Sequence, residues 1–219
     1  MTKQKTWLLA SLLVVAAVFG AGYYFYKQNT AQAQVATAQD QSAMLMRAGA
    51  PVFGAAEAKV TIVEFFDPAC EACRAFYAPV KQIVNTSFGR VNLVLRYAPL
   101  HKDSDKAAMM LEAARIQGKY WPAVEAALAS QAAWANHSQP DLNQLWPALQ
   151  AAGVDVERAK LDMNSEAVRA ILQQDVAALT ALKVQRTPTF YVNGKPLTDF
   201  GYEQLKQLVA DQSKIAYGS

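Results

Sequence analysis

The sequence predicts an α/β fold in which a helical insertion separates a βαβ half from a ββα half. Three patterns lead to this prediction: a strand–helix–strand order over 59–97, mostly helical periodicity over 104–182, and a strand hairpin followed by a helix near the C-terminus. With 219 residues, of which 53% are hydrophobic and 18% charged, the chain can bury a sizeable core. The net charge of +3 is small and no run of Lys or Arg stands out, so we expect no nucleic-acid partner.

An apolar segment precedes the domain. Residues 7–26, WLLASLLVVAAVFGAGYYFY, carry no charge and have lysines on both sides. A helix of twenty such residues can span a bilayer. This length and the aromatic cluster at its end favour an uncleaved anchor, whereas the small residues of Ala31-Gln32-Ala33 offer a signal-peptide cleavage site. Residues 1–27 are therefore expected to be a signal anchor or a signal peptide, and the remainder of the chain is expected to be exported in both cases.

The next segment predicts a stalk. Residues 28–50 are rich in Ala and Gln and poor in large apolar side chains. Because Ala and Gln favour helix, part of the stalk could be helical and could mediate self-association. We expect the folded domain to cover 51–219, with the helical insertion over about 104–182.

The βαβ half begins with a buried strand. Lys59 to Phe66, KVTIVEFF, is almost continuously apolar and rich in β-branched and aromatic residues, as in a strand covered on both faces. Asp67-Pro68 ends it, because Pro lacks the N–H that a sheet ladder needs. A helix is predicted from Cys70 to near Gly89, and a second strand over Val91 to Tyr97.

The rest of the domain is predicted to be the helical insertion and the ββα half. The periodicity over 104–182 predicts core positions, among them those of Met109, Met110, Trp121, Trp134 and Trp146. A hairpin is expected over Thr187 to Leu197, with Asn193-Gly194 as its turn, and an amphipathic helix over roughly Tyr202 to Ser213.

Cys70 and Cys73 are the only cysteines of the chain and suggest three kinds of site. A structural disulfide at this spacing closes too small a loop to constrain an unfolded chain much. A closed zinc site needs four ligands, and His101 and His137 lie in unrelated polar loops, where a histidine is more often merely solvated. We therefore expect no metal and no other cofactor.

The third kind of site, a redox centre, fits the position of the cysteines. C-x-x-C next to a βαβ pattern is typical of a thioredoxin-like redox motif. At the first turn of the helix, free backbone N–H groups and the helix dipole would stabilise a Cys70 thiolate. Cys73, one turn further on, can form or resolve the disulfide. From these positions we expect Cys70 to be exposed and Cys73 to be buried.

Thr187-Pro188 is the second feature of interest. A Pro that opens a strand is compatible with a cis bond in a tight turn, although a trans bond is the more common arrangement for such a Pro taken alone. The sequence leaves the isomer open.

Together these motifs resemble a known family. The run PVFGAAEAKVTIVEFFDPACEAC, followed by RTPTFYVNGKPL before a final helix, resembles the DsbA-like thioredoxin-fold proteins of the bacterial cell envelope over roughly 51–212. The resemblance implies a thiol:disulfide oxidoreductase with Cys70 as the nucleophile, Cys73 as the resolving cysteine and Thr187-Pro188 as a cis-Pro loop that pairs with a substrate peptide. It also implies a periplasmic location, on the inner membrane if the anchor is retained and soluble if it is cleaved.

Two acidic residues add to this interpretation. Glu64 matches a position where many such proteins carry an acid behind the active site, and a buried carboxyl there would have a raised pKa and could exchange protons with Cys73. The alternative is a solvated Glu at the end of a strand. Glu71 and Ala72 stand between the cysteines, where strongly oxidising relatives usually carry Pro and His. A Glu71 charge ~6 Å from the thiolate opposes it by roughly 0.7–3 kcal/mol, which predicts a less acidic Cys70 and a less oxidising disulfide than in those relatives.

The predicted activity is thiol–disulfide exchange with cysteines of envelope proteins, assisted by a membrane redox partner. The direction stays open, since Glu71 and the Thr before Pro188 favour a reductase or isomerase and the single domain with a large insertion favours an oxidase. The oligomeric state is also open, because 28–50 could support a homo-oligomer. The alternative function is a thioredoxin-fold binding or chaperone module without redox turnover.

Overall fold

The structure is a computed structural model that describes residues 23–24, 27 and 44–218. The predicted signal segment over 1–27 and the predicted stalk over 28–50 therefore lie largely outside the described residues. Within the part that is described, no helix is both long and apolar enough to cross a membrane. The compact unit that contains the predicted redox motif is Ala43–Ser219.

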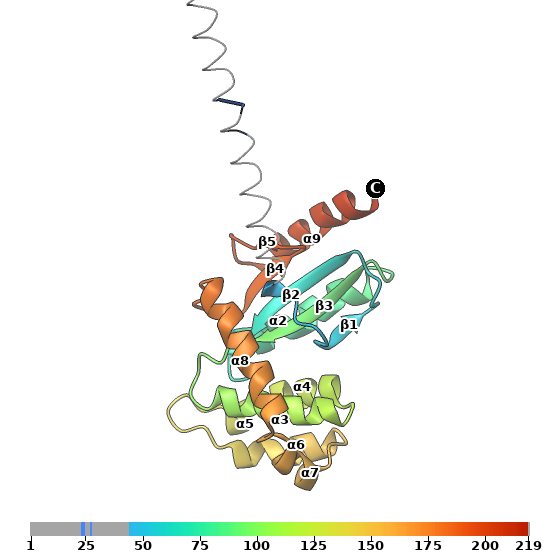
Figure 1. Cartoon of the computed structure of the whole chain (residues 1–219). Coiled ribbons are helices and arrows are strands. Elements are labelled where there is room, and N and C mark those ends of the chain that lie inside the picture. Colours follow the sequence, from blue (N-terminus) through green and yellow to red (C-terminus); the bar gives the residue numbers. More distant parts are fainter. Residues whose placement is uncertain (1–22, 25–26, 28–43, 219) are drawn as a thin grey trace, which may run out of the picture. The chain divides into compact units, whose positions relative to one another are not determined.

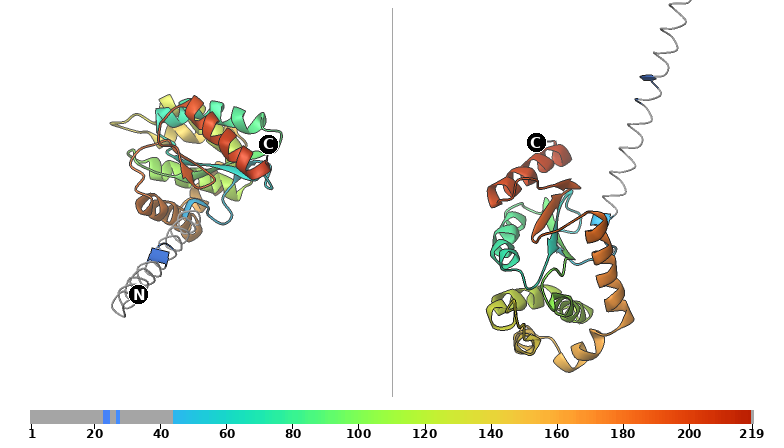
Figure 2. Two further views of the ribbon diagram at one scale, coloured as in Figure 1. Left: turned by 90° about the horizontal axis from the view of Figure 1, so that it is seen from above. Right: turned by 90° about the vertical axis from the view of Figure 1, so that its left-hand side faces the viewer.

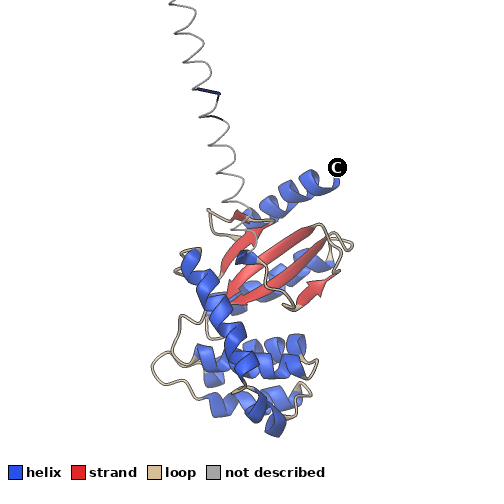
Figure 3. Cartoon of the chain, in the orientation of Figure 1, coloured by secondary structure: helices blue, strands red, loops and turns tan. Residues whose placement is uncertain are grey.

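A five-stranded mixed sheet forms the centre of this unit (Figure 1 and Figure 3). The central strand β2 pairs parallel with β3 on one side and antiparallel with β4 on the other. The outer strands β1 and β5 pair antiparallel with β3 and β4. In the order β1-β3-β2-β4-β5 the strands are Val52–Gly54, Val91–Tyr97, Val60–Phe66, Thr189–Val192 and Lys195–Pro196.

Helices cover both faces of the sheet and one of its ends. The described helices are α2 (Glu71–Asn85), α3 (Ser104–Ile116), α4 (Tyr120–Ala129), α5 (Gln131–Trp134), the 3₁₀ helix η1 (Leu142–Gln144), α6 (Leu145–Ala151), α7 (Val156–Asp162), α8 (Glu166–Ala181) and α9 (Tyr202–Tyr217). The right-hand view of Figure 2 shows α2 and α9 on one side of the sheet and α8 on the other. Helices α3 to α7 gather at one end of the sheet, so the predicted insertion between the two halves is confirmed.

The central position of β2 follows from its composition. Every residue of this strand except Thr61 is buried, because α-helices cover both faces of the sheet at this point. The predicted strand over Val91 to Tyr97 coincides with β3, and all seven of its residues are buried. The turn between β4 and β5 uses Asn193 and Gly194 with positive φ values of 46° and 81°, as the predicted hairpin requires.

The insertion packs through small residues and one large aromatic residue. Ala107, Ala113 and Ala123 are fully buried, which lets neighbouring helices approach closely. Trp134 is also fully buried, and its indole N–H donates to the carbonyl oxygen of Ala127 at 2.9 Å. The expected core role of Met110 agrees with its exposure of 1%.

The domain begins earlier than Pro51, the position expected from composition. Leu45 is 2% exposed and belongs to a small apolar cluster with Phe65 and Val184. The guanidinium of Arg96 donates to the carbonyl oxygens of Met44 and Leu45, each at 2.7 Å. Residues 44–50 are thus part of the folded unit, and only 28–43 remain for a stalk.

Candidate redox site

The two cysteines lie where β2 meets the sheet-covering helix α2. Cys70 is the N-cap of α2, and Cys73 lies in its first turn. They do not form a disulfide, so the structure shows the dithiol form. Cys73 is fully buried as expected, but Cys70 is only 6% exposed, and the expectation of an exposed Cys70 was wrong.

The loop that contains Pro188 lies against Cys70. The Thr187–Pro188 peptide bond is cis. This loop places the carbonyl oxygen of Thr187 3.3 Å from the sulfur of Cys70, so that the thiol S–H can donate to it. The sequence left the isomer open and separated these residues by 117 positions, and the fold brings them into contact.

The pKa values of the two thiols are shifted in opposite directions. The pKa of Cys70 is lowered from 9.0 to about 5, chiefly by a hydrogen bond from the Cys73 thiol, while burial acts in the opposite direction. The Thr187 side chain and the backbone N–H groups of Ala72 and Cys73 at the helix start lower this pKa further. Burial raises the pKa of Cys73 far above its usual value, and the neighbouring Cys70 and Glu64 charges add to this effect. Cys70 is therefore chemically suited to attack and leave, and Cys73 to stay protonated until it is activated.

Glu64 lies in the middle of β2, beneath the cysteines. It is fully buried, so the alternative of a solvated strand end is excluded. Within the described part of the chain, neither carboxyl oxygen has a hydrogen-bond partner at normal distance. Burial raises the pKa of Glu64 to about 8, the charge of Cys70 raises it further, and interaction with the Cys73 thiol opposes both. Near neutral pH this group can hold a proton or release it, which is what an acid–base partner for Cys73 needs.

Asp67 organises the loops around the site, a role the sequence analysis did not assign to it. It is fully buried, and its Oδ1 accepts the N–H of Ala69 at 2.8 Å. Its Oδ2 accepts the N–H groups of Leu100 and His101 at 2.7 and 2.9 Å and contacts Nδ1 of His101 at 2.8 Å. A single carboxylate thus holds the β2–α2 turn against the β3–α3 loop. The only signal in the sequence was an acid directly before a Pro, which reads equally well as an ordinary strand end.

The helical insertion also reaches the site. Gln131 of α5 is buried, and its Nε2 donates to the carbonyl oxygens of Pro68 and Cys70 at 2.8 and 3.0 Å. His137, expected to be merely solvated, is exposed but lies 2.6 Å from Oε1 of Glu71 through its Nε2. His101, also expected to be solvated, is half-buried and paired with Asp67. Sequence reasoning missed these contacts because the partners lie on distant segments.

These groups do not form a metal-binding cluster. Among the residues that the structure describes, no three His, Cys, Asp or Glu side chains are placed to hold a metal ion. The histidines instead bind carboxylates, and the cysteines bind each other and the Thr187 loop.

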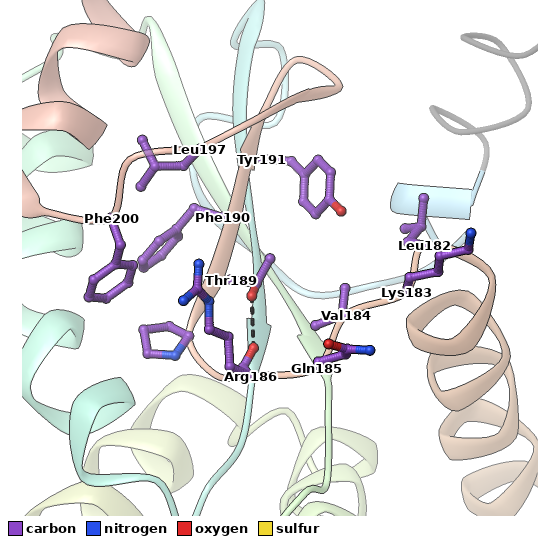
Figure 4. Close-up of a pocket in the computed structure, with 11 residues that line it drawn as sticks. Leu182, Lys183, Val184, Gln185, Arg186, Thr189, Phe190, Tyr191, Leu197 and Phe200 are labelled. Atoms are coloured by element: carbon purple, nitrogen blue, oxygen red, sulfur yellow. Dashed lines mark hydrogen bonds between the residues drawn. The ribbon is translucent and has the colours of Figure 1, made fainter.

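A cavity of about 460 Å³ opens beside the loop that carries Pro188 (Figure 4). Its lining residues include Pro188, and Figure 4 shows Phe190, Phe200 and Arg186 on one side of β4 and Tyr191 on the other. Thr189 donates its hydroxyl to the carbonyl oxygen of Arg186 at 2.7 Å, which fixes the turn into β4. The cavity borders the segment that contacts Cys70 and has room for the side chain of a bound peptide.

The site consists of a dithiol at the start of a helix, with one acidic and one buried, weakly acidic thiol, and a cis-Pro loop beside the reactive sulfur. These features define a thiol:disulfide oxidoreductase on a thioredoxin fold. Residues 46–211 match the family model described as "Thioredoxin". The chain belongs to this family and, as the motifs suggested, to its DsbA-like group.

Relatives agree with this assignment. The probable disulfide bond formation protein D of Bacillus anthracis is 30% identical over 171 residues, which cover 74% of this chain and 77% of that protein. The solved structure of a thioredoxin-like oxidoreductase from Silicibacter pomeroyi DSS-3 is 32% identical with a TM-score of 0.67, and the match covers 78% of this chain and 95% of that one. A third relative, the Na(+)/H(+) antiporter NhaA of Herminiimonas arsenicoxydans, is 32% identical over 145 residues, or 66% of this chain, but the match spans only 22% of the antiporter's length.

Proposed function

We propose that this protein is an exported oxidoreductase that exchanges a Cys70–Cys73 disulfide with cysteines of envelope proteins, with disulfide formation in the substrate as the main direction. The observation that carries the proposal is the acidic Cys70 sulfur at the start of α2, 3.3 Å from the carbonyl oxygen of Thr187. A thiolate that is stable at neutral pH favours the reduced form of the protein, and this makes its disulfide a strong oxidant. The name of the Bacillus anthracis relative, a disulfide bond formation protein, supports the same direction.

The exchange proceeds in two balanced steps. A substrate thiolate attacks the sulfur of Cys70 in the disulfide form, the Cys70–Cys73 bond breaks, and Cys73 leaves as a thiolate that takes a proton from Glu64. A second substrate thiolate then attacks the substrate sulfur of the mixed disulfide, and Cys70 leaves as a thiolate. Two electrons pass from the substrate to the protein, which ends as the dithiol. Return to the disulfide requires an electron acceptor, which we take to be a redox partner in the membrane.

The substrate peptide lies along the Thr187 loop in this proposal. Backbone pairing of an extended peptide with this loop is a form of β-addition. The adjacent cavity lined by Pro188 and Phe200 would then accept a side chain next to the reacting cysteine.

The location and the domain organisation are part of the proposal. Residues 1–27 act as a signal anchor or a signal peptide, 28–43 as a stalk that could support a homo-oligomer, and 44–219 as the redox domain. If the anchor is retained, the domain lies on the periplasmic side of the inner membrane.

Trapping of mixed disulfides tests the function. In Cys73→Ser the second cysteine cannot resolve the intermediate, so the full chain, expressed in its bacterial envelope, should accumulate disulfide-linked partners that reductant releases. Cys70→Ser is the matched control and should trap none. Refolding of a scrambled disulfide substrate should be lost in Cys70→Ser, and unchanged activity in that variant would favour the binding or chaperone module instead.

A further inference from the structure

Two histidines and two carboxylates from separate segments meet beside Cys70. Nε2 of His137, in the loop between α5 and η1, lies 2.6 Å from Oε1 of Glu71, the first residue of α2. The ring of His137 lies 5.3 Å from that of His101, measured between centroids, with an interplanar angle of 51°. His101 in turn contacts Asp67 at 2.8 Å. At the start of α2 two adjacent imidazoles, one of them supplied by the insertion, therefore lie between two carboxylates.

We propose that His137 is a positioning residue of the redox site, which binds the Glu71 carboxylate so that its charge does not act against the Cys70 thiolate. The inference rests on the proposed exchange at Cys70 and deepens it by naming the group that sets how strongly the disulfide oxidises. The two residues between the cysteines are Glu71 and Ala72, and the imidazole that pairs with Glu71 comes from the helical insertion.

The contacts of Glu71 support this role. An isolated carboxylate directly after Cys70 would make its thiolate less stable by about tenfold in equilibrium at a separation of ~6 Å. Glu71 is not isolated, and its pKa is lowered first by its own backbone N–H and then by the hydrogen bond to His137. The Glu71 carboxylate is therefore engaged by Nε2 of His137 at 2.6 Å and does not stand free next to Cys70.

The charge balance at the site depends on pH. The charged and titratable groups in and around the Glu71–His137 pair are Asp67, Cys70, Glu71, His101, Lys102 and His137. With His101 protonated, this imidazolium and Lys102 adjoin the three anions of this set. When His101 loses its proton, three negative charges remain opposite Lys102, whose Nζ donates to the carbonyl oxygen of Ser138 at 3.3 Å.

The sign of the pH effect follows from His101. Although burial lowers its pKa, contact with Asp67 and the charges of Cys70 and Glu71 raise it above 6.5. The support that the His101 imidazolium gives to the reduced form is therefore complete below pH 6.5 and is lost as the pH rises through the raised pKa of His101. The oxidising strength of the disulfide should fall with pH more steeply in this range than titration of the thiols alone would cause.

A double-mutant cycle tests the inference. The reduced full-length protein, in variants His137→Ala, Glu71→Gln and the double variant, is titrated by thiolate absorbance to obtain the Cys70 pKa, and its disulfide is equilibrated with glutathione. His137→Ala should raise the Cys70 pKa and lower the equilibrium constant for oxidation of glutathione about tenfold, or ~30 mV. In the Glu71→Gln background the same replacement should change the constant less than about twofold, because no carboxylate is left without its partner.

Two further variants separate charge from structure. His137→Lys places a permanent cation next to Glu71, so it should keep the equilibrium constant at neutral pH near the wild-type value. Gln139→Ala changes an exposed residue of the same loop and should leave both quantities as in the wild type.

The inference is overturned if His137→Ala changes neither quantity, or if it has the same effect in the wild-type and Glu71→Gln backgrounds. Failure of the proposed function would be distinct: the wild type itself would not equilibrate with glutathione, while the absorbance titration would still report the coupling between His137 and Glu71.

Discussion

The sulfur of Cys70 and the carbonyl oxygen of Thr187 lie 3.3 Å apart, although the two residues come from opposite halves of the fold. Cys70 follows the central strand β2, and Thr187 precedes β4, which pairs antiparallel with β2. The register of this pairing, with Phe65 opposite Thr189, brings the end of β2 next to the start of β4. The reactive sulfur is thus positioned by the sheet itself, and any substrate sulfur joined to Cys70 must lie beside the backbone of the Thr187 loop.

The low pKa of Cys70 predicts how the stability of the reduced protein depends on pH. Because the folded pKa of about 5 is below the usual 9.0, the thiolate contributes stability that is fully present above pH 9 and is lost as the pH falls toward 5. Urea unfolding should therefore show reduced wild type gaining stability over Cys70→Ser between pH 5 and pH 8. The oxidised wild type has no Cys70 thiolate and serves as the control, and an equal gap between reduced wild type and Cys70→Ser at both pH values would contradict the assignment.

Thr187→Val should make Cys70 less acidic. Valine keeps the shape of the side chain but removes the hydroxyl, and the Thr187 side chain is one of the groups that lower the Cys70 pKa. The backbone carbonyl that accepts from the thiol stays in place. We expect the midpoint of the pH profile for alkylation of Cys70 to move upward by about half a unit to one unit, since a hydrogen bond to a charged group contributes roughly 1.5 kcal/mol. Thr189→Val, whose hydroxyl binds Arg186 instead, is the control and should leave the midpoint unchanged.

Glu64→Gln should slow the steps that move a proton to or from Cys73. The buried carboxyl has a pKa of about 8, whereas Gln has nearly the same shape and cannot exchange a proton in this range. We expect release of Cys73 from the mixed disulfide to slow by at least about tenfold at pH 7, within the usual effect of losing an acid–base group. Stopped-flow exchange with a thiol-containing peptide measures this rate. Glu57→Gln alters an exposed carboxyl before β2 and should have no effect, and a wild-type rate in Glu64→Gln would remove Glu64 from the proton path.

Glu64→Gln should also change how the stability of the folded protein depends on pH. The folded pKa of Glu64 lies above its ordinary value of 4.5, so relative to Gln the acid becomes less favourable as the pH rises from 4.5 through 8. Glu64→Gln should therefore gain stability over wild type between pH 5 and pH 9. A constant difference across this range would show that Glu64 has an ordinary pKa in the folded protein.

What the sequence could and could not predict reflects the range of the interactions involved. Strands β2 and β3, the hairpin turn at Asn193-Gly194 and the helical insertion depend on local periodicity and turn chemistry, and these were predicted correctly. The two cysteines were found because their spacing is itself the motif. The short strand β1 was missed because three residues carry too little pattern to be recognised.

The parts of the site that were not predicted all depend on contacts between distant segments. Glu71 and His137 are 66 positions apart, and each one alone looks like a solvated polar residue. Asp67 looks like a strand end, yet it binds the loop that follows another strand. The expectation that Glu71 makes Cys70 less acidic than in relatives with Pro and His between the cysteines stays a prediction.

Asp175 provides the clearest case of this kind outside the site and gives the last prediction. It lies on α8, which the sequence pattern treats as an ordinary amphipathic helix, but its side chain is fully buried. Its Oδ1 accepts from Arg96 at 2.6 Å and from Arg47 at 3.1 Å, and its Oδ2 accepts the N–H of Tyr97 at 2.9 Å. One carboxylate therefore joins α8, β3 and the N-terminal segment 44–50.

Asp175→Asn should destabilise the protein by about 3–5 kcal/mol, because it leaves two buried guanidinium groups without their shared charge partner. Arg96 would still donate to the carbonyl oxygens of Met44 and Leu45, so the first effect should be loosening of the segment around Arg47, which retains only a 3.6 Å contact with Glu112. Trypsin should then cleave after Arg47 much faster than in the wild type. Asp211→Asn, an exposed acid on α9, should change unfolding by less than about 0.5 kcal/mol. Unchanged cleavage and stability in Asp175→Asn would show that the N-terminal segment is held to the domain by its apolar contacts alone.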